Sequence, residues 1–487
     1  MKRLLLVTAL LLIAGLTLIA CNSVPPTTAP TTAPVTQPTT APVTQPTAAS
    51  TSPTTAPSAG GQTAGESEAA ARAAGLTTLA DAYAGKFKGQ IVTMTGPFVD
   101  ADAVKFNNSM KAFQDATGIQ IQYSGSKTFE ASITTQVQSG APPDVVDFPQ
   151  PGLAGTFAKQ GKVVAADTLV PMTWLKQNYK QSWLDIPTVT GPDGKPMLVG
   201  IVQRFSGKDE VWYPKAAFDK AGYKVPQTWD DLMTLTDQIA KDGDTAWCLG
   251  IGSGAATGWP ATDWIEALLL RTTTPENYDK WVAGTLKFDS PEVRNAIGVM
   301  DKIWKNPKYV YGGTAAIVST QFSDAPTPMF QNPPKCWLHK QGNFITSFFP
   351  QTAKAGVDYD FFYLPPVDPK YGKPYEVAGD IMVAFNNKPA TAALMQLFST
   401  GAGVKGWLAA GGALGPQNDV NLDWYGDPIE KKIAGFVKDS TVVRFDGSDL
   451  MPGAVGAGSF WKGMTDYYSG AANLDTVLKQ IDASWPK

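Results

Sequence analysis

Histidine is almost absent from this chain: His339 is the only one in 487 residues. A Ser-His-Asp or Cys-His catalytic arrangement would therefore have to use that residue. It lies in the apolar segment Cys336-Trp337-Leu338-His339, so we expect a structural position in a strand rather than a chemical role. A zinc site needs about four ligands and is disfavoured for the same reason. We predict no metal and no cofactor.

Cysteine is also scarce, with three residues in the whole chain. Cys21 belongs to the N-terminal signal described below, which leaves Cys248 and Cys336 as an even pair. In an exported protein such a pair predicts a disulfide, with two buried thiols as the alternative.

The chain lacks an excess of positive charge and, beyond its first segment, any long apolar run. Forty Lys and Arg stand against 43 Asp and Glu, and removing Lys2 and Arg3 with the signal leaves 38 against 43, or a net charge of -5. A nucleic-acid partner needs a basic stripe to neutralise phosphates, so this class is disfavoured. No later stretch approaches 18 uninterrupted apolar residues, and no further membrane span is expected.

Common catalytic motifs are missing. The chain has no Walker A sequence and no Gly-x-Ser-x-Gly elbow. The segment Gly401 to Gly406 matches Gly-x-Gly-x-x-Gly, but it follows a helical pattern that begins at Pro389, whereas a dinucleotide fingerprint follows a strand. We interpret it as a helix end and a turn. Acids available for a glycosidase pair, which needs a separation of about 5 or 9 Å, are Asp209, Glu210, Asp380, Asp446 and Asp449.

The first 21 residues carry the pattern of an export signal. Lys2 and Arg3 precede an apolar stretch of about 17 residues, the short end of what a membrane span requires. Small residues before a cleavage point end a secretory signal, and Cys21 directly after Leu18-Ile19-Ala20 resembles the lipobox of a bacterial lipoprotein. We therefore expect a signal peptide at residues 1–20 and a lipid on Cys21 that anchors the protein outside the cytoplasm, on the cell membrane. A transmembrane anchor is the alternative.

The segment after Cys21 is a low-complexity linker. Residues 22–60 consist almost entirely of Thr, Pro, Ala, Ser and Gln, and residues 31–38 repeat unchanged as 39–46. Such a composition buries too little apolar surface to offset its ordering entropy, and its prolines favour an extended spacer. We predict a disordered linker over residues 21–75, with a short helix over 66–84.

From about Gln90 the pattern becomes that of a folded α/β protein. Strand patterns cover residues 91–95, 119–123, 361–364 and 381–385. Helix starts are predicted at Asp102, Thr228, Ser290 and Pro389, and a last amphipathic helix runs over 474–485. Because strands alternate with helices, we expect mainly parallel sheets.

Several segments, in order, resemble one known family. The matching segments are Phe113-Gln114-Asp115-Ala116-Thr117-Gly118-Ile119, Gly140-Ala141-Pro142-Pro143-Asp144-Val145-Val146, Trp212-Tyr213-Pro214-Lys215 with Pro226-Gln227-Thr228-Trp229-Asp230-Asp231, Val377-Ala378-Gly379-Asp380, and Ser459-Phe460-Trp461. Together they are similar to the extracellular solute-binding proteins of bacterial carbohydrate ABC importers, the class that includes maltose-binding protein. Further segments around residues 258–264 and 342–344 resemble its α-glucoside or oligosaccharide branch.

The resemblance implies a fold of two α/β lobes with the ligand cleft at the hinge between them. The chain of this family passes between the lobes three times, so each lobe is discontinuous. We expect one lobe at residues 88–204 plus 362–402 and the other at 205–361 plus 403–487. Cys248 and Cys336 then fall in the same lobe.

The resemblance also implies a set of ligand contacts. Sugars offer hydroxyls at their edges and C–H patches on their faces, so their sites combine carboxylates, amides and flat aromatic rings. Asp380 is the most distinctive candidate, because a carboxylate in an otherwise apolar segment is costly unless it is bonded. The predicted ligand-binding residues are Phe148, Gln150, Arg204, Lys208, Trp259, Asn343, Phe344, Asp380 and Trp461. Lobe packing is the alternative for the aromatic members.

The function implied is that of a monomeric substrate-binding lipoprotein, not an enzyme. It captures a carbohydrate, such as an oligosaccharide or α-glucoside, by hinge closure and delivers it to an ABC permease. The alternatives are a secreted glycoside-active enzyme, a surface lectin, or a binding protein for a non-sugar solute.

Overall fold

The computed structural model describes residues 63–486, which form one compact unit. The predicted signal peptide, the lipidation site Cys21 and most of the predicted linker lie outside the described residues. Within the described range, no helix combines the length and the apolar character that crossing a membrane requires.

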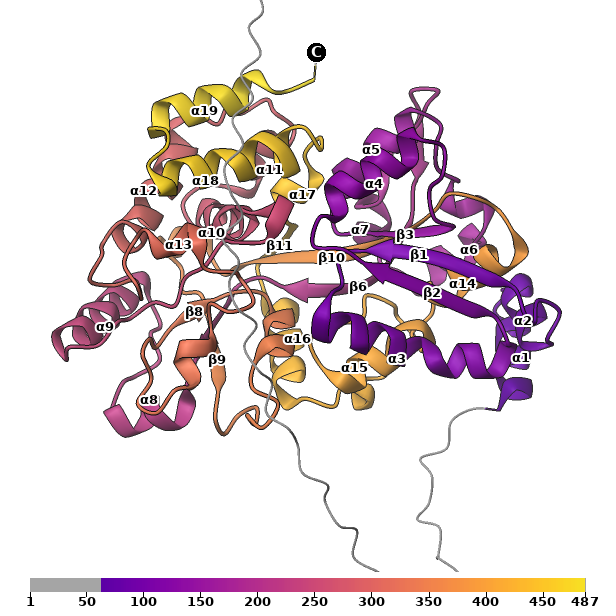
Figure 1. Ribbon diagram of the computed structural model, residues 1–487, viewed down its shortest axis with the longest axis horizontal. Coiled ribbons are helices and arrows are strands. Elements are labelled where there is room, and N and C mark those ends of the chain that lie inside the picture. Colours follow the sequence, from indigo (N-terminus) through magenta and orange to yellow (C-terminus); the bar gives the residue numbers. More distant parts are fainter. Residues whose placement is uncertain (1–62, 487) are drawn as a thin grey trace, which may run out of the picture. The chain divides into compact units, whose positions relative to one another are not determined.

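The main sheet has six strands, with the order β11-β10-β3-β1-β2 and with β6 paired to β10. Their bounds are β1 Ile91–Gly96, β2 Gln120–Gly125, β3 Val145–Phe148, β6 Ile201–Gly207, β10 Pro374–Ala384 and β11 Val442–Phe445. β1 is parallel to β2 and β3, whereas the long strand β10 is antiparallel to β3 and β6 and parallel to β11. In Figure 1, β10 and β6 run from the strands β1–β3 toward the rest of the protein.

Helices cover this sheet on both faces. They are α3 Asp100–Thr117, α4 Phe129–Gln138, α5 Pro151–Lys159, α14 Pro389–Phe398 and α15 Ala402–Ala410, with α1 Ala64–Ala73 and α2 Thr77–Tyr83 beside α14. Smaller elements complete this side: η1 Ala166–Thr168, α6 Met172–Asn178, α7 Gln181–Asp185 and the hairpin β4 Thr188–Thr190 with β5 Pro196–Leu198. α15 packs against α3.

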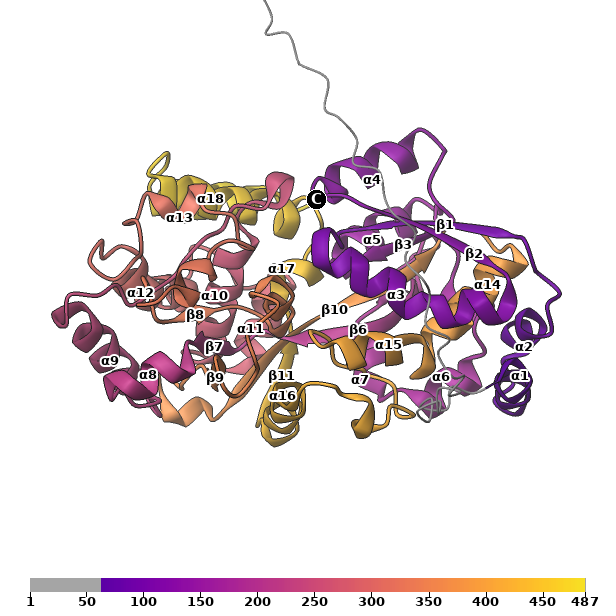
Figure 2. The same ribbon diagram turned by 60° about the horizontal axis from the view of Figure 1, so that its bottom comes forward.

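A second, antiparallel sheet has the order β8-β7-β9. Its strands are β7 Glu210–Tyr213, β8 His339–Lys340 and β9 Asp360–Tyr363. The elements between them are α8 Lys215–Ala221, α9 Trp229–Lys241, η2 Gly254–Ala256, α10 Trp259–Leu270, α11 Pro275–Val282, α12 Pro291–Trp304, α13 Ala316–Ser319, η3 Thr327–Phe330 and η4 Asn343–Phe348, and η5 Pro369–Tyr371 follows. Both ribbon views place β7–β9 and α8–α12 on the side away from β1–β3 (Figure 2).

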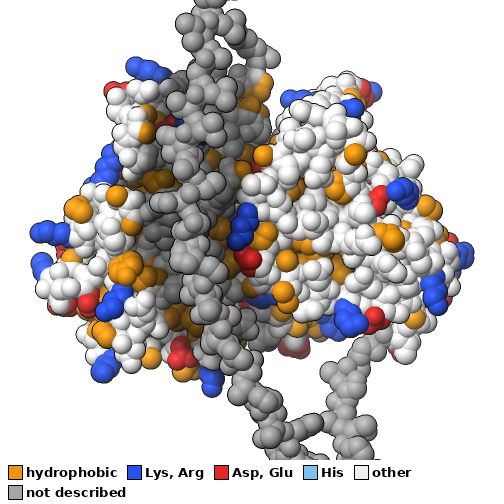
Figure 3. Space-filling view, viewed as in Figure 1, with side chains coloured by type: hydrophobic (Ala, Val, Ile, Leu, Met, Phe, Trp, Pro, Cys, Tyr) orange, Lys and Arg blue, Asp and Glu red, His pale blue; other side chains and the backbone are white. Residues whose placement is uncertain are grey.

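The C-terminal elements return to this second side. They are α16 Pro428–Asp439, α17 Gly447–Leu450, the π-helix η7 Val455–Phe460, α18 Trp461–Ser469 and α19 Leu474–Ala483, whereas η6 Leu422–Trp424 packs beside α15. Residues from α9, α10, α12, α18 and α19 share one buried apolar core with β7. The cluster around β1 extends to Trp212 of β7 and Phe361 of β9, and a third cluster joins β3 to α4 and α5. Acidic and basic side chains are interspersed over the part of the surface visible in Figure 3.

Local capping signals set several helix ends as predicted. The Thr228 hydroxyl accepts from the Asp231 amide while the Asp231 carboxylate accepts from Thr228, a capping box that opens α9. Ser290 caps α12. Gly118 ends α3 with a φ of 71°, a left-handed conformation that favours glycine.

Three expectations about local structure are wrong. Asp102 does not cap a helix, because α3 begins at Asp100 and Asp102 lies buried in its first turn. The single helix expected over 66–84 is two helices, α1 and α2, and α1 falls inside the segment predicted as linker. Only three of the eight strand pairs among the described residues are parallel, because β10 enters the main sheet in the reverse direction and the second sheet is built from returning strands.

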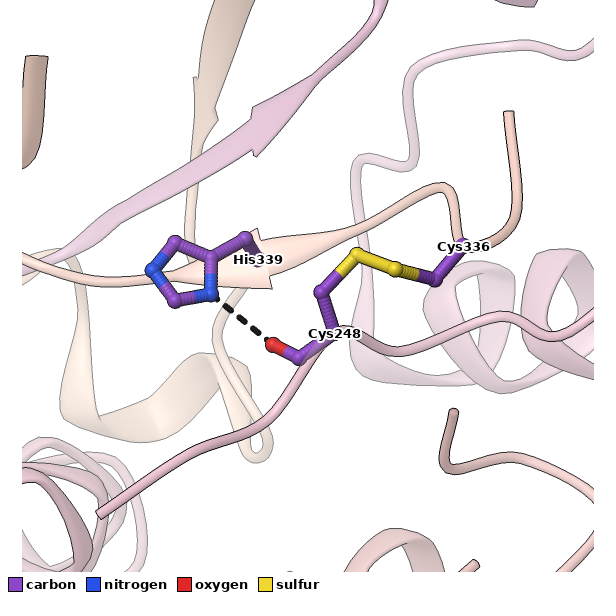
Figure 4. Close-up of a disulfide and its surroundings, with 3 residues drawn as sticks. All are labelled: Cys248, Cys336 and His339. Carbon is purple, nitrogen blue, oxygen red and sulfur yellow. Dashed lines mark hydrogen bonds between the residues drawn. A yellow bond between two sulfur atoms is a disulfide. The ribbon is translucent and has the colours of Figure 1, made fainter. Parts of the chain in front are cut away.

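The predicted disulfide is confirmed: Cys248 and Cys336 are bonded, with Cα atoms 5.4 Å apart. Figure 4 shows His339 beside this bridge, with its Nδ1 hydrogen-bonded to the Cys248 carbonyl at 2.8 Å. His339 is buried in β8, the structural position that the sequence predicts.

Candidate functional site

A cavity of about 590 Å³ lies where β6, β10, α10 and α17 meet the first turns of α3 and α4. This volume is within the usual range for small-molecule sites. Eight acidic residues line it, namely Asp100, Asp102, Glu130, Asp263, Asp324, Asp380, Asp446 and Asp449, and three basic residues, Lys127, Arg204 and Lys208. The aromatic lining residues are Phe98, Trp259, Phe322, Phe344, Phe348 and Trp461.

The first wall of the cavity depends on a cross-strand pair. Arg204 on β6 lies directly opposite Asp380 on β10, and its Nε is 2.9 Å from the Asp380 carboxylate. The pairing register shifts just after Asp380, an irregularity of the kind that re-aims side chains near sites. The guanidinium also lies over the rings of Phe98 and Trp407, 4.6 and 4.1 Å from their centroids. Arg204 is therefore held in place by both charge and aromatic contacts.

Lys208 lies just beyond β6 and makes a second buried ion pair. Its ammonium is 2.7 Å from Asp263 on α10 and 3.1 Å from Asp446, the residue that caps α17. Burial opposes the charge of Lys208, but the two carboxylates outweigh it and hold the lysine pKa well above its usual value. The same group lies 5.0 Å from the centre of the Trp259 ring.

Lys208 also accounts for the acidic cluster beneath the cavity. Oxygens of Asp263, Glu376 and Asp446 lie within 4.8 Å of one another, which is close enough to share a cation. The Lys208 ammonium bonds two of these three carboxylates. The Lys208 ammonium of the protein itself therefore supplies the positive charge among these three carboxylates.

A second wall of the cavity is aromatic. The Trp259 ring packs edge-on against Phe322 and beside Phe344, with centroids 5.0 and 5.8 Å away. Gly258 makes this wall possible, because a Cβ there would lie 2.2 Å from the Trp461 carbonyl oxygen and its φ is +117°. Trp461 begins α18 immediately after a π-helix, an irregular element often found at functional sites.

Apart from the Arg204 Nε, which faces Asp380, four buried polar atoms of the lining residues have no hydrogen-bond partner among the described residues. Three are acceptors, the Oδ1 atoms of Asp102 and Asp263 and the Oε1 of Gln150, and the fourth is the indole N–H of Trp461. Buried polar groups are nearly always bonded in folded proteins. These three acceptors and one donor are therefore complementary to a ligand that offers mostly hydrogen-bond donors.

Burial also shifts the pKa of several carboxyl groups in the cavity. It raises the pKa of Asp102, Glu130 and Asp380, and it raises the pKa of Asp449 well above the usual value. Each of these groups is therefore easier to protonate than a solvent-exposed carboxyl group, and Asp380 keeps its ion pair with Arg204. Because burial penalises any further charge in the same way, an uncharged ligand fits such a site better than a strongly charged one.

The structure brings together seven of the nine residues predicted to bind ligand. Gln150, Arg204, Lys208, Trp259, Phe344, Asp380 and Trp461 all line the cavity.

The other two predicted residues lie elsewhere. Phe148 is fully buried and packs against Phe129 and Phe157. Asn343 is also fully buried, where it donates to Glu430 and accepts from the Gly207 amide, joining β6 to α16.

Several lining residues were not predicted. Asp263 had a detectable signal, because it is one of two carboxylates, with Glu266, in the largely apolar helix α10. Asp446 and Asp449 were noted only as acids, although their spacing is that of a helix cap. Phe98, Phe322 and Phe348 carry no local signal, since aromatic residues at such positions are usually core.

Comparison with known proteins places this geometry in a family. The sequence model described as "Bacterial extracellular solute-binding protein" matches residues 100–409, more than half of the chain. The chain belongs to that family. Like its other members, this solute-binding protein acts outside the cytoplasm.

Two relatives match over most of their length. The alpha-glucosides-binding periplasmic protein AglE of Rhizobium meliloti is 42% identical over 402 residues, which are 82% of this chain and 87% of that protein. The osmoprotective compounds-binding protein GgtB of Synechocystis is 40% identical over 399 residues, or 81% and 92%.

Solved structures agree on the fold of this solute-binding protein. The bacterial solute receptor AcbH has a TM-score of 0.68 at 18% identity, with 81% of this chain and 97% of that chain covered. A maltose-bound protein of T. maritima has a TM-score of 0.63 at 14% identity, with 81% and 98% covered. The predicted two-lobe fold is thereby confirmed.

Proposed function

We propose that this protein is the carbohydrate receptor of an ABC importer and that its cargo is an oligosaccharide, such as an α-glucoside. One observation carries the proposal: the cavity combines aromatic rings with buried acceptors that have no hydrogen-bond partner among the described residues. Sugar hydroxyls supply donors to such acceptors, and the C–H face of a pyranose packs on a ring such as Trp259 or Trp461. The name of the relative AglE supports the same ligand class.

A second ligand class is a small uncharged osmolyte rich in hydroxyls. The name of the relative GgtB, which binds osmoprotective compounds, favours this candidate. An anionic cargo such as phosphate is disfavoured because acidic residues outnumber basic ones in the lining by eight to three, and Arg204 and Lys208 already hold carboxylates.

Capture proceeds by closure of the two lobes around the ligand. The two bodies that move are the predicted lobes, residues 88–204 with 362–402 and residues 205–361 with 403–487. Packing of α15 against α3 favours moving this boundary, so that residues 402–410 belong to the first lobe rather than to the second. A ligand that contacts both walls binds the closed form better and shifts the population toward it. No covalent step is needed, so the protein binds and releases its cargo unchanged.

Delivery to the permease takes place at the membrane surface. The lipid on Cys21 and the Thr- and Pro-rich linker would tether the folded body, as a monomer, within reach of the membrane subunits. Globomycin treatment of cells, which blocks lipoprotein signal cleavage, tests the anchor. Retention of the uncleaved chain supports it, and normal processing contradicts it.

Isothermal titration of the purified protein against a panel of saccharides and osmolytes tests the binding function. Ligand at 100 times its Kd adds about 2.7 kcal/mol of stability, so melting curves provide the first screen. Binding of one saccharide class, with the sugar recovered intact, supports the proposal. Degradation of the sugar identifies an enzyme instead, and binding of osmolytes alone selects the second class.

Substitutions of Trp461 and Trp424 test whether the ligand binds in this cavity. Trp461→Phe keeps a ring but removes the unpartnered N–H, and loss of about 1 kcal/mol for one hydrogen bond weakens binding by roughly fivefold. Trp461→Ala removes the ring as well and weakens binding further. Trp424→Ala, which changes a tryptophan outside the lining, is the control and retains full affinity. Equal effects of Trp461→Ala and Trp424→Ala would refute the assignment.

A further inference from the structure

A second hollow of about 370 Å³ adjoins the cavity. We call it the outer groove. One side consists of α4 and α5, which contribute Thr134, Gln138, Thr156 and Gln160. The other side consists of Ala255 and the backbone around the π-helix at residues 453–457.

Glu130 connects the two hollows, since it lines both of them. Its carboxylate accepts a hydrogen bond of 3.3 Å from the amide of Gln150, a residue of the inner cavity. The outer groove therefore adjoins the candidate site at the hydrogen-bonded pair of Glu130 and Gln150.

The lining of the outer groove has two kinds of surface. Leu153 and Phe157 form an apolar floor, and both are nine-tenths or more buried. Around this floor, Gln138, Thr156 and Gln160 present amide and hydroxyl groups from exposed positions. An apolar floor with a polar rim suits a sugar ring, whose faces are apolar and whose edges carry hydroxyls.

The side opposite the two helices consists of small residues that let the backbone come close. A Cβ at Gly453 would lie 3.1 Å from the Leu153 side chain, so the segment just before the π-helix lies directly against α5. This close approach bounds the groove on the side of residues 453–457.

We propose that the outer groove binds further sugar units of an oligosaccharide whose first units occupy the inner cavity. This inference rests on the proposed carbohydrate function and extends it to chain length. It predicts that affinity rises with the number of sugar units beyond those that the inner cavity holds, because each additional unit gains contacts with α4 and α5.

The test is titration calorimetry with mono-, di-, tri- and tetrasaccharides of one linkage. Thr134→Trp fills the groove from α4, and Thr156→Trp fills it from α5. Because Thr156 is exposed, its variant retains the fold. Thr135→Trp is the matched control, because Thr135 is the next residue of α4 and does not line the groove. Wild type and Thr135→Trp should gain at least tenfold in affinity along the series, and the two groove variants should lose that gain.

The outcomes separate the two proposals. If wild type binds a short saccharide and gains nothing with length, or if the groove variants keep the gain, the groove proposal is overturned while the carbohydrate function stands. If no saccharide of any length binds to wild type, the proposed function fails and the groove proposal fails with it.

Discussion

The only histidine of the chain offers a sharp test of how burial controls charge in this fold. His339 is buried, and its Nδ1–H donates to the Cys248 carbonyl. Its Nε2 has no hydrogen-bond partner among the described residues. Burial lowers the pKa of His339 from 6.5 to about 4, with the Cys248 carbonyl opposing part of that change. The folded protein therefore keeps this ring neutral at pH values where the unfolded chain protonates it.

The sign and size of the effect follow from that difference. Between pH 6.5 and pH 4 the unfolded state binds more protons, so the free energy of unfolding falls as the pH falls through this window. The gap between 6.5 and about 4, at about 1.4 kcal/mol for each pKa unit, amounts to about 3 kcal/mol. This contribution is fully present at pH 7 and is lost by about pH 4.

Urea unfolding of wild type and His339→Asn between pH 7.5 and pH 3.5 measures this contribution of His339 to the free energy of unfolding. Asparagine has an amide that donates to the same carbonyl but does not titrate in this range. Other buried groups, such as Glu210 and Glu430 with pKa values raised by burial to about 8, affect both proteins equally and cancel in the difference. The advantage of wild type over the variant should shrink by about 3 kcal/mol from pH 7 to pH 4. A difference that stays constant across this range refutes the argument.

Three further predictions concern stability. Asp380→Ala leaves Arg204 buried without its carboxylate and should cost about 3–5 kcal/mol in urea unfolding, part of which Arg204→Met should restore in the double variant. Replacing both disulfide cysteines by alanine opens a loop with a sequence separation of 88 and should cost about 4 kcal/mol, while a reductant should lower the melting temperature of wild type alone. Gly258→Ala forces a Cβ against the Trp461 carbonyl and should cost at least about 1–3 kcal/mol, with weaker ligand binding; unchanged melting would contradict the close approach.

The sequence by itself determined helix starts, because their capping signals lie within a few neighbouring residues. Thr228 and Ser290 start helices because their hydroxyls reach amides three positions along the chain, and this requires no distant partner. The order of short motifs was sufficient to indicate the family and the two-lobe fold. Two cysteines in an exported chain were sufficient to predict a disulfide, although their Cα distance is a property of the fold.

The tertiary structure decided which side chains face the cavity. Phe148 and Arg204 were both predicted to bind the ligand, yet Phe148 is packed between helices and Arg204 lines the site. Neighbouring residues of a strand point to opposite faces, so a shift of one position reverses what a residue contacts. Asp263 and Asp446, far apart in sequence, became part of the site only because α10 and α17 meet at Lys208. Such contacts depend on the packing of whole elements, and no local pattern encodes them.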